Sequence, residues 1–484
     1  MPSYDTLQPR AVWEIFARMS AVPRGSGNEA AVQSMFKAWA AERGLACKED
    51  KVGNLLICIP ATSGLEKARP VLIQGHVDMV CEKNAATKHD FQKDPIKLQI
   101  QGDWLTADGT TLGADNGIGV AMGLALAEEK GLKHGPIEVL LTVDEERGLT
   151  GAAGVQAGWF SARTMINLDS EEDGAIFMGC AGGRDSVITL KLRAGKAPQG
   201  WVGRKVALKG LKGGHSGLDI HTGRGNANKL LARALKMAAA ELDVRVAAIG
   251  GGMLRNAIPR EAEARVLIKD ADARRFKQLV DACLEAALAS ELQDSDPGLE
   301  WRVSPVKVEK AWTAADTARL LDLLIAIPNG VLGMSRALPE LVETSSNLGV
   351  VKTDGNAVRL TCCSRSSVMS QLAHLVDQHR AIALLAGADV VQPAGYPAWQ
   401  PNPRSPLLAV TVAEYQRLFE RTPELKAIHA GLECGLFLEN YPELDIVSFG
   451  PNIKGAHSPD EKVQISSVQM IWTLFTAVVE KLAK

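Results

Sequence analysis

The sequence lacks the features that define membrane, secreted and nucleic-acid-binding proteins. Its 484 residues include no apolar run approaching the roughly 20 residues that span a bilayer, and the N-terminal MPSYDTLQPR lacks the apolar core of a signal peptide. The net charge of −2 provides no basic surface for nucleic acid and no polybasic anchor for a membrane. We therefore expect a cytoplasmic protein that binds neither nucleic acid nor a membrane.

Cysteine and glycine motifs with a known chemistry are also missing. The eight cysteines form no CxxC pair, and Cys362 and Cys363 are adjacent, which disfavours a structural disulfide, so reduced, structural thiols are expected. The glycine-rich turn DGTTLGADNGIG (108–119) contains neither GxGxxG nor GxxxxGK followed by Ser or Thr, and its aspartate would repel phosphate. The turn is therefore not interpreted as a nucleotide-binding loop.

What the sequence does contain is a set of metal-ligand residue types placed directly after apolar runs. Runs rich in Val, Ile and Leu are typical of buried parallel strands, and ligand sites in open α/β sheets lie beyond the carboxyl ends of such strands. Asp115 differs, because it lies in the glycine-lined turn, where a single carboxylate can bridge two cations. The five candidate ligands are His76 (in VLIQGHVDMV, 71–80), Asp115, Glu146 (in IEVLLTVDEERG, 137–148), Asp169 (in MINLDSEE, 165–172) and His457 (in SFGPNIKGAHSPDE, 448–461).

Two histidines and three carboxylates are what a pair of zinc-like ions uses, with water in the open positions. Each part has a simpler explanation. A lone histidine beside a strand is usually a hydrogen-bonded structural residue, and an acidic pair such as Glu145-Glu146 usually caps a helix start. Four such clusters at strand ends are hard to explain by coincidence, so the sequence predicts a binuclear metallohydrolase.

Residues beside the ligands can be assigned roles in part. In an extended His-Val-Asp segment, side chains two apart project to the same side, so Asp78 is expected to accept the second ring N–H of His76 and fix the ligating tautomer. Of Glu145 and Glu146, one is expected to bind metal and the other to transfer protons. Their spacing does not decide which.

The pattern of elements predicts a discontinuous catalytic domain with an insertion. Residues 1–184 alternate amphipathic helices with apolar strands, which is typical of a mainly parallel sheet flanked by helices, and residues 396–484 return to this pattern and supply His457. Residues 185–395 would form the inserted domain. The helices expected in the catalytic domain span residues 10–19, 28–43, 117–130, 406–419 and 464–483, and the strands 54–59, 71–77, 137–143, 164–168 and 445–449.

The insertion shows a weak internal repeat. Residues 251–270 and 343–367 each place an Asn before two strand-like runs joined by a turn, and helical stretches follow at 271–289 and 367–386. Two related α+β halves, each with helices on one face of an antiparallel sheet, would explain this repeat. The alternative is that N-x-x-P and N-x-G are common turn signals.

Three residues of the insertion are candidates for substrate binding. His215 lies in GGHSG, whose small residues allow close backbone approach. Arg365 follows an apolar strand and can pair bidentately with a carboxylate, and Asn256 can hydrogen-bond a substrate backbone. The alternatives are a surface turn histidine, a solvated arginine and an asparagine that shapes its own turn. In IHAGLECGLF, Glu433 either binds a free amino terminus or is a buried, hydrogen-bonded carboxylate.

Together these motifs resemble a known family. GHVDMV, GADNGIG, DEERG, NLDSEE and AHSPDE are similar to the zinc-dependent exopeptidases related to glutamate carboxypeptidase and carnosinase. GLKGGHSGLDIH (210–221), LRNAIPRE (254–261) and IHAGLECGLF (428–437) resemble one branch of that family, the aminoacyl-histidine dipeptidases. The resemblance extends from about Leu7 to the C-terminus, nearly the whole chain.

The resemblance implies a division of roles among the candidate ligands. Asp115 would bridge two metal ions, with Glu146 and His457 on one ion and His76 and Asp169 on the other. The remaining glutamate, Glu145, would be the general base.

The resemblance also implies how the inserted domain acts. It would be a lid, from which His215 reaches the scissile carbonyl, often in the partner subunit, so a homodimer is expected. The wider family commonly has D-x-K-G after the bridging aspartate, whereas this chain has Asp115-Asn116-Gly117. That difference fits the dipeptidase branch and leaves the role of Asn116 open.

We therefore expect a dipeptidase with two divalent ions, zinc by preference, with cobalt or manganese as alternatives. The resemblance implies Xaa-His substrates such as β-alanyl-histidine, with tolerance for other dipeptides. One alternative is an N-acyl amino acid deacylase on the same scaffold, which would share the metal site. The other is a non-catalytic metal-binding protein, against which Glu145 argues, because a binding site needs no unligated carboxylate facing the water.

Overall fold

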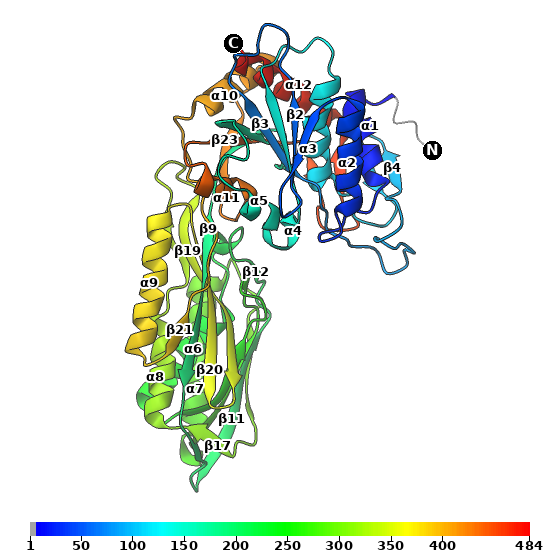
Figure 1. Cartoon of the computed structure of the whole chain (residues 1–484). Helices are drawn as coiled ribbons and strands as arrows, with labels where there is room; N and C mark the ends of the chain where they lie inside the picture. The colour runs from blue at the N-terminus through cyan, green and yellow to red at the C-terminus, as the bar shows by residue number, and fades with distance from the viewer. Residues whose placement is uncertain (1–5) are drawn as a thin grey trace. The chain divides into compact units, whose positions relative to one another are not determined.

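The computed structural model describes residues 6–484, which form two compact units (Figure 1). The first unit comprises Met1–Gly179, Pro401–Ala427 and Leu432–Lys484, and the second comprises Cys180–Gln400 and Ile428–Gly431. The units differ in detail from the predicted segments, since residues 428–431 cluster with the second unit. Among the described residues, no helix combines the length and the apolar character that crossing a membrane requires.

The first unit is built around an eight-stranded sheet whose four central strands run parallel. Its strand order is β1 (Ala46–Glu49), β2 (Leu55–Ile59), β6 (Ile137–Thr142), β3 (Val71–His76), β7 (Thr164–Asn167), β23 (Asp445–Ser448), β8 (Ala175–Cys180) and β22 (Glu424–Ile428). The pairs β6–β3, β3–β7 and β7–β23 are parallel, whereas β1–β2, β2–β6 and β23–β8 are antiparallel. The predicted α/β class with a mainly parallel sheet is confirmed for this central part.

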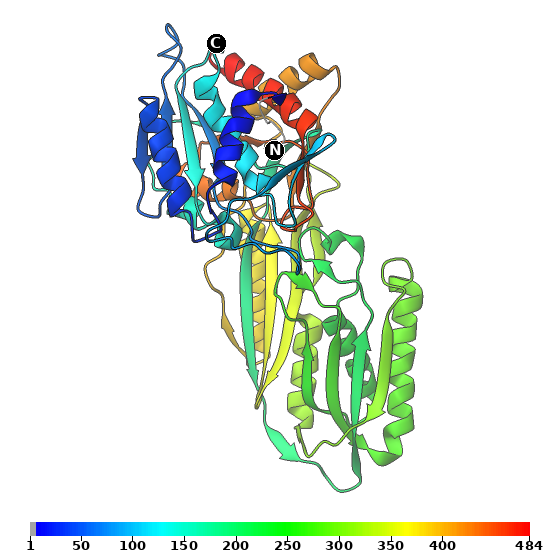
Figure 2. The ribbon, with the colours of Figure 1, turned by 90° about the vertical axis from the view of Figure 1, so that its right-hand side faces the viewer.

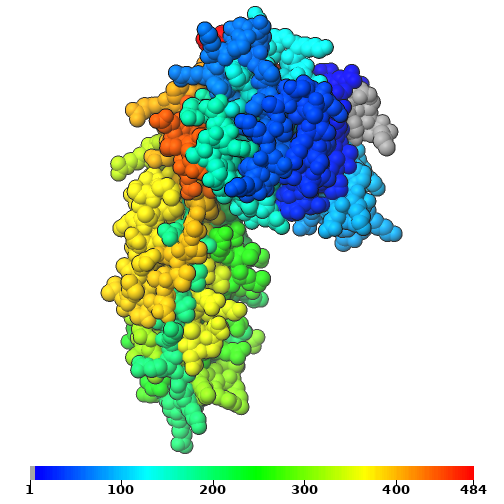
Figure 3. All heavy atoms as spheres, viewed as in Figure 1, coloured from blue at the N-terminus to red at the C-terminus, as the bar shows by residue number. Residues whose placement is uncertain are grey.

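Burial explains why these strands are apolar throughout. Every residue of β3 is buried, because helices cover both faces of the central sheet. The C-terminal segment completes the unit, and Figure 3 shows its orange residues beside the teal ones of the N-terminal segment. Tyr441 stacks on Phe160 at 3.8 Å between ring centroids. The helices are α1 (Arg10–Ser20), α2 (Ala30–Glu42), α3 (Ala114–Ala125), α4 (Glu145–Gly148), α5 (Thr150–Gly154), α10 (Pro406–Phe419), α11 (Glu433–Asn440) and α12 (Ile465–Leu482).

The predicted helices and strands of this unit lie within a few residues of the observed ones. A small antiparallel sheet was not predicted, because its outer strand β4 (Leu98–Gln101) is short, half polar and only partly buried, and so shows no apolar run. Its order is β24 (Ile453–Lys454), β25 (Lys462–Gln464), β5 (Trp104–Ala107) and β4 (Leu98–Gln101).

The second unit contains a nine-stranded antiparallel sheet made of two halves with the same topology (Figure 2). In chain order the first half is β11 (Trp201–Lys209), α6 (Ala227–Glu241), β13 (Arg245–Gly251), β15 (Ala262–Lys269), α7 (Ala273–Ala287) and β16 (Glu300–Pro305). The second half is β9 (Gly182–Lys191), α8 (Ala314–Ala326), β19 (Val342–Asp354), β20 (Ala357–Ser366), α9 (Met369–Leu385) and β21 (Asp389–Val391), with β18 (Gly330–Met334) added beside β19.

The strand pairings of the two halves correspond one to one. In the first half β11 lies between β16 and β15, and β15 pairs with β13; in the second half β9 lies between β21 and β20, and β20 pairs with β19. The pair β13–β19 joins the halves into one sheet. The predicted α+β insertion of two related halves is thus confirmed, and the whole first half is inserted between β9 and α8 of the second.

The asparagines that suggested this repeat are not equivalent. Asn347 lies inside β19, whereas Asn256 lies in the connection between β13 and β15. That connection is long because it contains β14 (Ala257–Ile258), which pairs with β12 (Gly214–His215) outside the main sheet. The corresponding connection between β19 and β20 is the short turn at residues 355–356. The Asn-based alignment was therefore wrong, although the repeat exists.

Candidate active site

The five candidate ligands all lie in the first unit, at the edge where the parallel strands end. His76 is the last residue of β3, Glu146 follows β6, Asp169 follows β7, and Asp115 lies in the turn that opens α3. His457, with a φ of 61°, lies in the loop between β24 and β25. Their donor atoms form overlapping groups within 4.8 Å, namely His76–Asp115–Asp169, Asp115–Glu146–His457 and His76–Glu145–Glu146.

Asp115 lies between the two histidines. Its Oδ1 is 3.2 Å from His76 Nε2, and its Oδ2 is 3.0 Å from His457 Nε2. His76 Nε2 is also 3.4 Å from Asp169 Oδ1, and His457 Nε2 is 3.1 Å from Glu146 Oε2. The two oxygens of one carboxylate thus face two separate sets of donors, each with one histidine and one further carboxylate.

Asp78 lies behind His76, as its spacing predicted. His76 Nδ1 is 3.4 Å from Asp78 Oδ1 and 3.2 Å from the Asp78 carbonyl oxygen. The same carboxylate accepts hydrogen bonds from Ser26 Oγ at 2.7 Å and from the backbone N–H groups of Glu145 and Glu146 at 3.1 and 3.3 Å. Burial opposes ionisation of Asp78, but the bonds from His76 and Ser26 prevail and lower its pKa to about 2. Asp78 therefore orients both His76 and the segment that carries the two glutamates.

The two glutamates face different partners. After β6 the chain turns at Asp144, whose φ is 52°, so Glu145 and Glu146 form the first turn of the short helix α4. The pair therefore does lie at a helix start, as the simpler interpretation expected, but neither glutamate side chain caps the helix. Glu146 Oε2 lies 3.1 Å from His457, and Glu146 belongs to the groups around both histidines, whereas Glu145 belongs only to the group around His76. Burial is the main cause that raises the pKa of Glu145 well above its ordinary value, with further contributions from Glu433, Asp169 and Glu146.

The remaining pKa shifts show a cluster in which protons and hydrogen bonds balance an excess of negative charge. Hydrogen bonds to Asp115 and Glu146 raise the pKa of His457 to about 11. Burial lowers the pKa of His76, but Asp169, Asp115 and Asp78 outweigh it and raise that pKa well above its ordinary value. Burial raises the pKa of Asp169 to about 6.

The donor set fits divalent cations. Two imidazoles and three carboxylates from separate elements converge at hydrogen-bonding distances, and the buried Glu146 Oε1 has no hydrogen-bond partner among residues 6–484. Nitrogen and oxygen donors of this kind suit zinc and also cobalt or manganese. Divalent cations would replace the shared protons and neutralise the carboxylates.

A buried carboxylate beside this cluster had no assigned role. Glu433, the first residue of α11, accepts hydrogen bonds from Gln74 Nε2 at 2.6 Å and Thr142 Oγ at 2.9 Å. Its other oxygen has no hydrogen-bond partner in the described part of the chain, and burial raises its pKa to about 8. The structure therefore places Glu433 as a buried, hydrogen-bonded carboxylate, one of the two interpretations left open by the sequence.

His215 and Arg365 meet in the second unit, far apart in sequence but on neighbouring segments. Arg365, at the end of β20, is 5% exposed and donates to Tyr396 Oη at 2.8 Å and to Ser216 Oγ at 3.4 Å. Its Nη2 is 3.5 Å from His215 Nε2. Arg365 is therefore not a solvated arginine. Tyr396 carried no sequence signal, because only the fold brings residues 365 and 396 together.

The tautomer of His215 follows from its hydrogen bonds. Its Nδ1 accepts from the backbone N–H groups of Gly217 and Leu218 at 3.3 and 3.1 Å, so the ring proton of the neutral side chain is on Nε2. Burial and the Arg365 charge lower the pKa of His215 and favour this neutral form. Nε2–H and the Arg365 guanidinium are then two donors facing each other, which is an arrangement suited to an oxygen acceptor from a ligand.

Asn256 differs from these two residues. Its side chain is exposed, while its carbonyl oxygen accepts a hydrogen bond from Ser216 N at 2.8 Å and thereby fixes the segment beside His215. Gly217 allows a second close approach, because a Cβ at this position would lie 2.2 Å from the His429 carbonyl oxygen. The shape of the turn around GGHSG thus depends on the backbone carbonyl groups of both Asn256 and His429.

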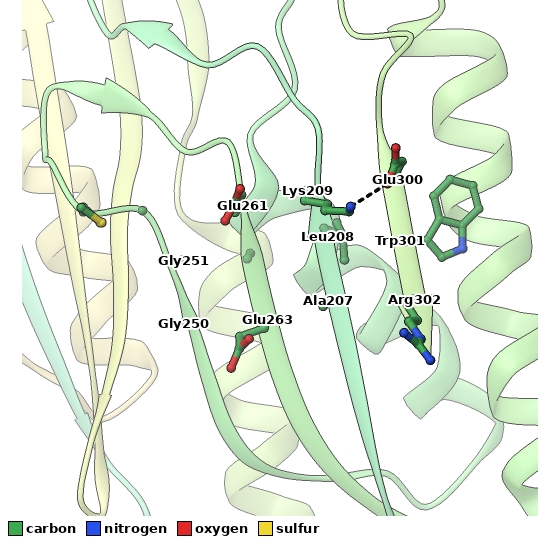
Figure 4. Close-up of a pocket in the computed structure, with 13 residues that line it drawn as sticks. Ala207, Leu208, Lys209, Gly250, Gly251, Glu261, Glu263, Glu300, Trp301 and Arg302 are labelled. Carbon is green, nitrogen blue, oxygen red and sulfur yellow. Dashed lines mark ion pairs between the residues drawn. The ribbon is translucent and has the colours of Figure 1, made fainter. Parts of the chain in front are cut away.

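A cavity of about 700 Å³ lies elsewhere in the second unit, on the sheet face opposite the helices (Figure 4). It is lined mainly by β11, β15 and β16 and contains an ion pair between Lys209 and Glu300 at 2.9 Å. Glu263, also on its wall, pairs with Lys205. None of the candidate site residues lines this cavity, and two of its three carboxylates, Glu263 and Glu300, are paired with lysines, so we assign the chemistry to the convergent ligands instead.

An α/β unit with a convergent histidine–carboxylate centre, carrying an insertion of two antiparallel α+β halves, defines the architecture of a metallopeptidase. Residues 72–481 match the model of peptidase family M20/M25/M40, and the chain belongs to this family. The resemblance drawn from the motifs is confirmed.

Two relatives that match nearly the whole chain are more than 40% identical to it. The cytosol non-specific dipeptidase of Escherichia coli (strain K12) is 46% identical over 483 residues, covering 100% of this chain and 99% of the relative. The crystal structure of aminoacylhistidine dipeptidase from Vibrio alginolyticus is 44% identical with a TM-score of 0.94, covering 99% of this chain and 98% of that one. Aminopeptidase PepT from Bacillus cereus, 17% identical with a TM-score of 0.59, covers 99% of this chain and 100% of that one and shares the fold.

Proposed function

We propose that this protein is a metal-dependent dipeptidase that binds two divalent cations, with zinc as the preferred metal. The observation that carries the proposal is the position of Asp115, whose two oxygens lie at 3.2 and 3.0 Å from the Nε2 atoms of His76 and His457. We assign Glu146 with His457 to one cation, His76 with Asp169 to the other, and Asp115 to both. Both full-length relatives are described as dipeptidases.

The chain's own residues supply the proton transfers and the binding of substrate. When bound, the metal ions polarise the peptide carbonyl and acidify water. Glu145 accepts a proton from the attacking water and passes it to the leaving amine. His215 Nε2–H donates to the oxyanion. Arg365 binds the terminal carboxylate and Asn256 the substrate backbone. The His215 tautomer supports its role, since Nδ1 is occupied by two backbone donors.

We propose Xaa-His dipeptides such as β-alanyl-histidine as substrates, with tolerance for other dipeptides. The name of the Vibrio alginolyticus relative supports this choice. We also propose a homodimer and, from the name of the Escherichia coli relative, a cytoplasmic location.

The dipeptide limit is tested by replacing Arg365 with alanine. A cation that pairs with the carboxylate one residue beyond the scissile bond leaves no space for a longer peptide. Losing this charge-assisted bond should cost about 1.5–3 kcal/mol of transition-state stabilisation, observed as a fall in kcat/KM for a free-acid dipeptide. The C-terminal amide of the same dipeptide, already a poor substrate of the wild type, should lose much less.

The acid and amide substrates, measured in wild type and Arg365→Ala, form a double cycle that cancels general damage to the second unit. Arg359→Ala is a matched control, because Arg359 lies on the same strand but is exposed. The control should retain the preference for the acid. If Arg365→Ala also retains it, another residue binds the carboxylate.

A panel of substrates separates the proposal from its alternatives. Wild-type protein should hydrolyse dipeptides, should leave tripeptides and N-acyl amino acids largely intact, and should lose activity on chelation. Faster hydrolysis of N-acyl amino acids would favour a deacylase on the same scaffold. No hydrolysis of any member, with metal bound, would favour a non-catalytic metal-binding protein.

A further inference from the structure

The turn that carries Asp115 is held by a carboxylate with no assigned role. Glu461 is 2% exposed, and its two oxygens accept four backbone hydrogen bonds from this turn. Oε2 accepts from Leu112 N at 2.8 Å and Gly113 N at 2.9 Å. Oε1 accepts from Ala114 N at 2.7 Å and Asp115 N at 3.3 Å. The turn therefore presents a row of N–H donors to a single side chain.

The carbonyl side of the same turn is held by a buried arginine. Arg24, which is 1% exposed, donates to the Gly113 carbonyl oxygen at 2.5 Å and to the Val77 and Asp78 carbonyl oxygens at 3.0 and 3.3 Å. Gly113 has a φ of 70°, and a Cβ there would lie 2.3 Å from Arg24 Nη2, so only glycine fits. Arg24 thus joins the turn to the end of β3, where His76 lies.

Glu461 also connects two candidate ligands from distant parts of the chain. It ends the loop that carries His457, and its own backbone is held by Ser458, through N–H to O at 3.1 Å, and by Thr106 Oγ, which donates to its carbonyl oxygen at 3.0 Å. The Glu461 carboxylate therefore fixes the position of the loop that carries His457 relative to the turn that carries Asp115. This explains how His457 Nε2 reaches Asp115 Oδ2 at 3.0 Å.

The geometry of the four hydrogen bonds suits a carboxylate, which offers acceptors on both oxygens. Four N–H donors need acceptors on both oxygens, whereas a glutamine in the same place would turn an NH2 group toward two of them. Two acceptor oxygens that meet four backbone donors favour a role for Glu461 in holding the turn.

We propose that Glu461 is a positioning residue that fixes Asp115 relative to His457, and so sets the affinity of the centre for its cations. This inference rests on the proposed metal centre and extends it to a residue that is not a ligand. Outer residues of this kind typically change metal affinity or activity by about 10–100-fold when replaced. We therefore expect Glu461→Gln to weaken metal binding by about this factor.

The test uses Co²⁺ as the probe on metal-free full-length protein. Affinity is measured by competition with a fluorescent chelator, and geometry by the visible absorption of bound Co²⁺. Glu461→Gln should bind Co²⁺ more weakly and with an altered absorption spectrum. Glu461→Asp, which keeps the charge but reaches fewer of the four donors, should give a smaller change in the same direction, and it carries the test if Glu461→Gln does not fold.

Two controls separate positioning from general effects. Thr106→Val removes one hydrogen bond to the Glu461 backbone and leaves the four bonds of its carboxylate, so it should change Co²⁺ affinity and the spectrum much less than Glu461→Gln does. Asp460→Asn removes an exposed charge from the neighbouring residue and should behave as the wild type.

The outcomes are distinguishable from failure of the metal centre itself. If wild-type protein binds Co²⁺ and Glu461→Gln binds it equally well with the same spectrum, the positioning role is wrong. An equal loss in Thr106→Val would also overturn it, because the effect would then be one of stability. If wild-type protein binds no Co²⁺, the proposed metal centre is wrong as well.

Discussion

Glu145→Gln is expected to retain both metal ions and to lose activity by about 10²–10⁴-fold, the typical cost of removing a general base. The physical reason is the division of the acidic pair: Glu146 Oε2 lies 3.1 Å from His457, whereas among residues 6–484 Glu145 forms no ion pair with a histidine and belongs only to the group around His76. A carboxamide at position 145 fills the same space but cannot accept the proton from water.

Glu146→Gln is the matched comparison, since it makes the same chemical change one residue along the same helix. It should weaken metal occupancy and lose activity for that reason. Metal content of the two purified variants, measured beside their hydrolysis of one dipeptide, decides the assignment. Equal loss of metal in both variants would show that the roles of the two glutamates are wrongly divided.

His215→Ala is expected to lower kcat with little change in metal content or thermal stability. His215 lies in the second unit, and its Nε2–H is available as a donor because Nδ1 is occupied by two backbone N–H groups. Loss of an oxyanion donor costs roughly 2.7–4 kcal/mol in the transition state, about a 10²–10³-fold fall in kcat.

The control for this prediction is His374→Ala, an exposed histidine on α9 of the same unit. It should leave kcat unchanged. An unimpaired kcat in His215→Ala would mean that GGHSG is a structural turn, and an equal fall in both variants would indicate damage to the unit as a whole.

The convergence of the candidate ligands was largely predictable from the sequence because most of them lie at or just after the ends of apolar strands. His76 ends a buried parallel strand, and Asp169 and the glutamate pair follow two others within a few residues; such strands place their carboxyl ends at one edge. The position of Asp78 followed from the two-residue periodicity of an extended segment. The choice between Glu145 and Glu146 did not, since it depends on the Asp144 turn and on a loop from the other end of the chain.

Other features could not be read from local patterns. Glu461 stands in the motif AHSPDE, but its role arises from four backbone donors that only the folded chain brings to it. Arg24 and Tyr396 act through contacts with distant segments in the same way. The repeat in the second unit was predicted correctly, but one detail used to predict it was wrong. The order of strands and helices is duplicated, whereas Asn256 and Asn347 occupy different positions in the two copies.

The central claim is that two cations held by these residues perform dipeptide hydrolysis. The most direct measurement is a titration of metal-free protein with Zn²⁺, in which hydrolysis of β-alanyl-histidine and bound metal per chain are followed together. The account predicts two Zn²⁺ bound per chain, with full activity only when both are present. Full activity with one ion per chain, or hydrolysis that is unaffected by removing metal, would contradict it.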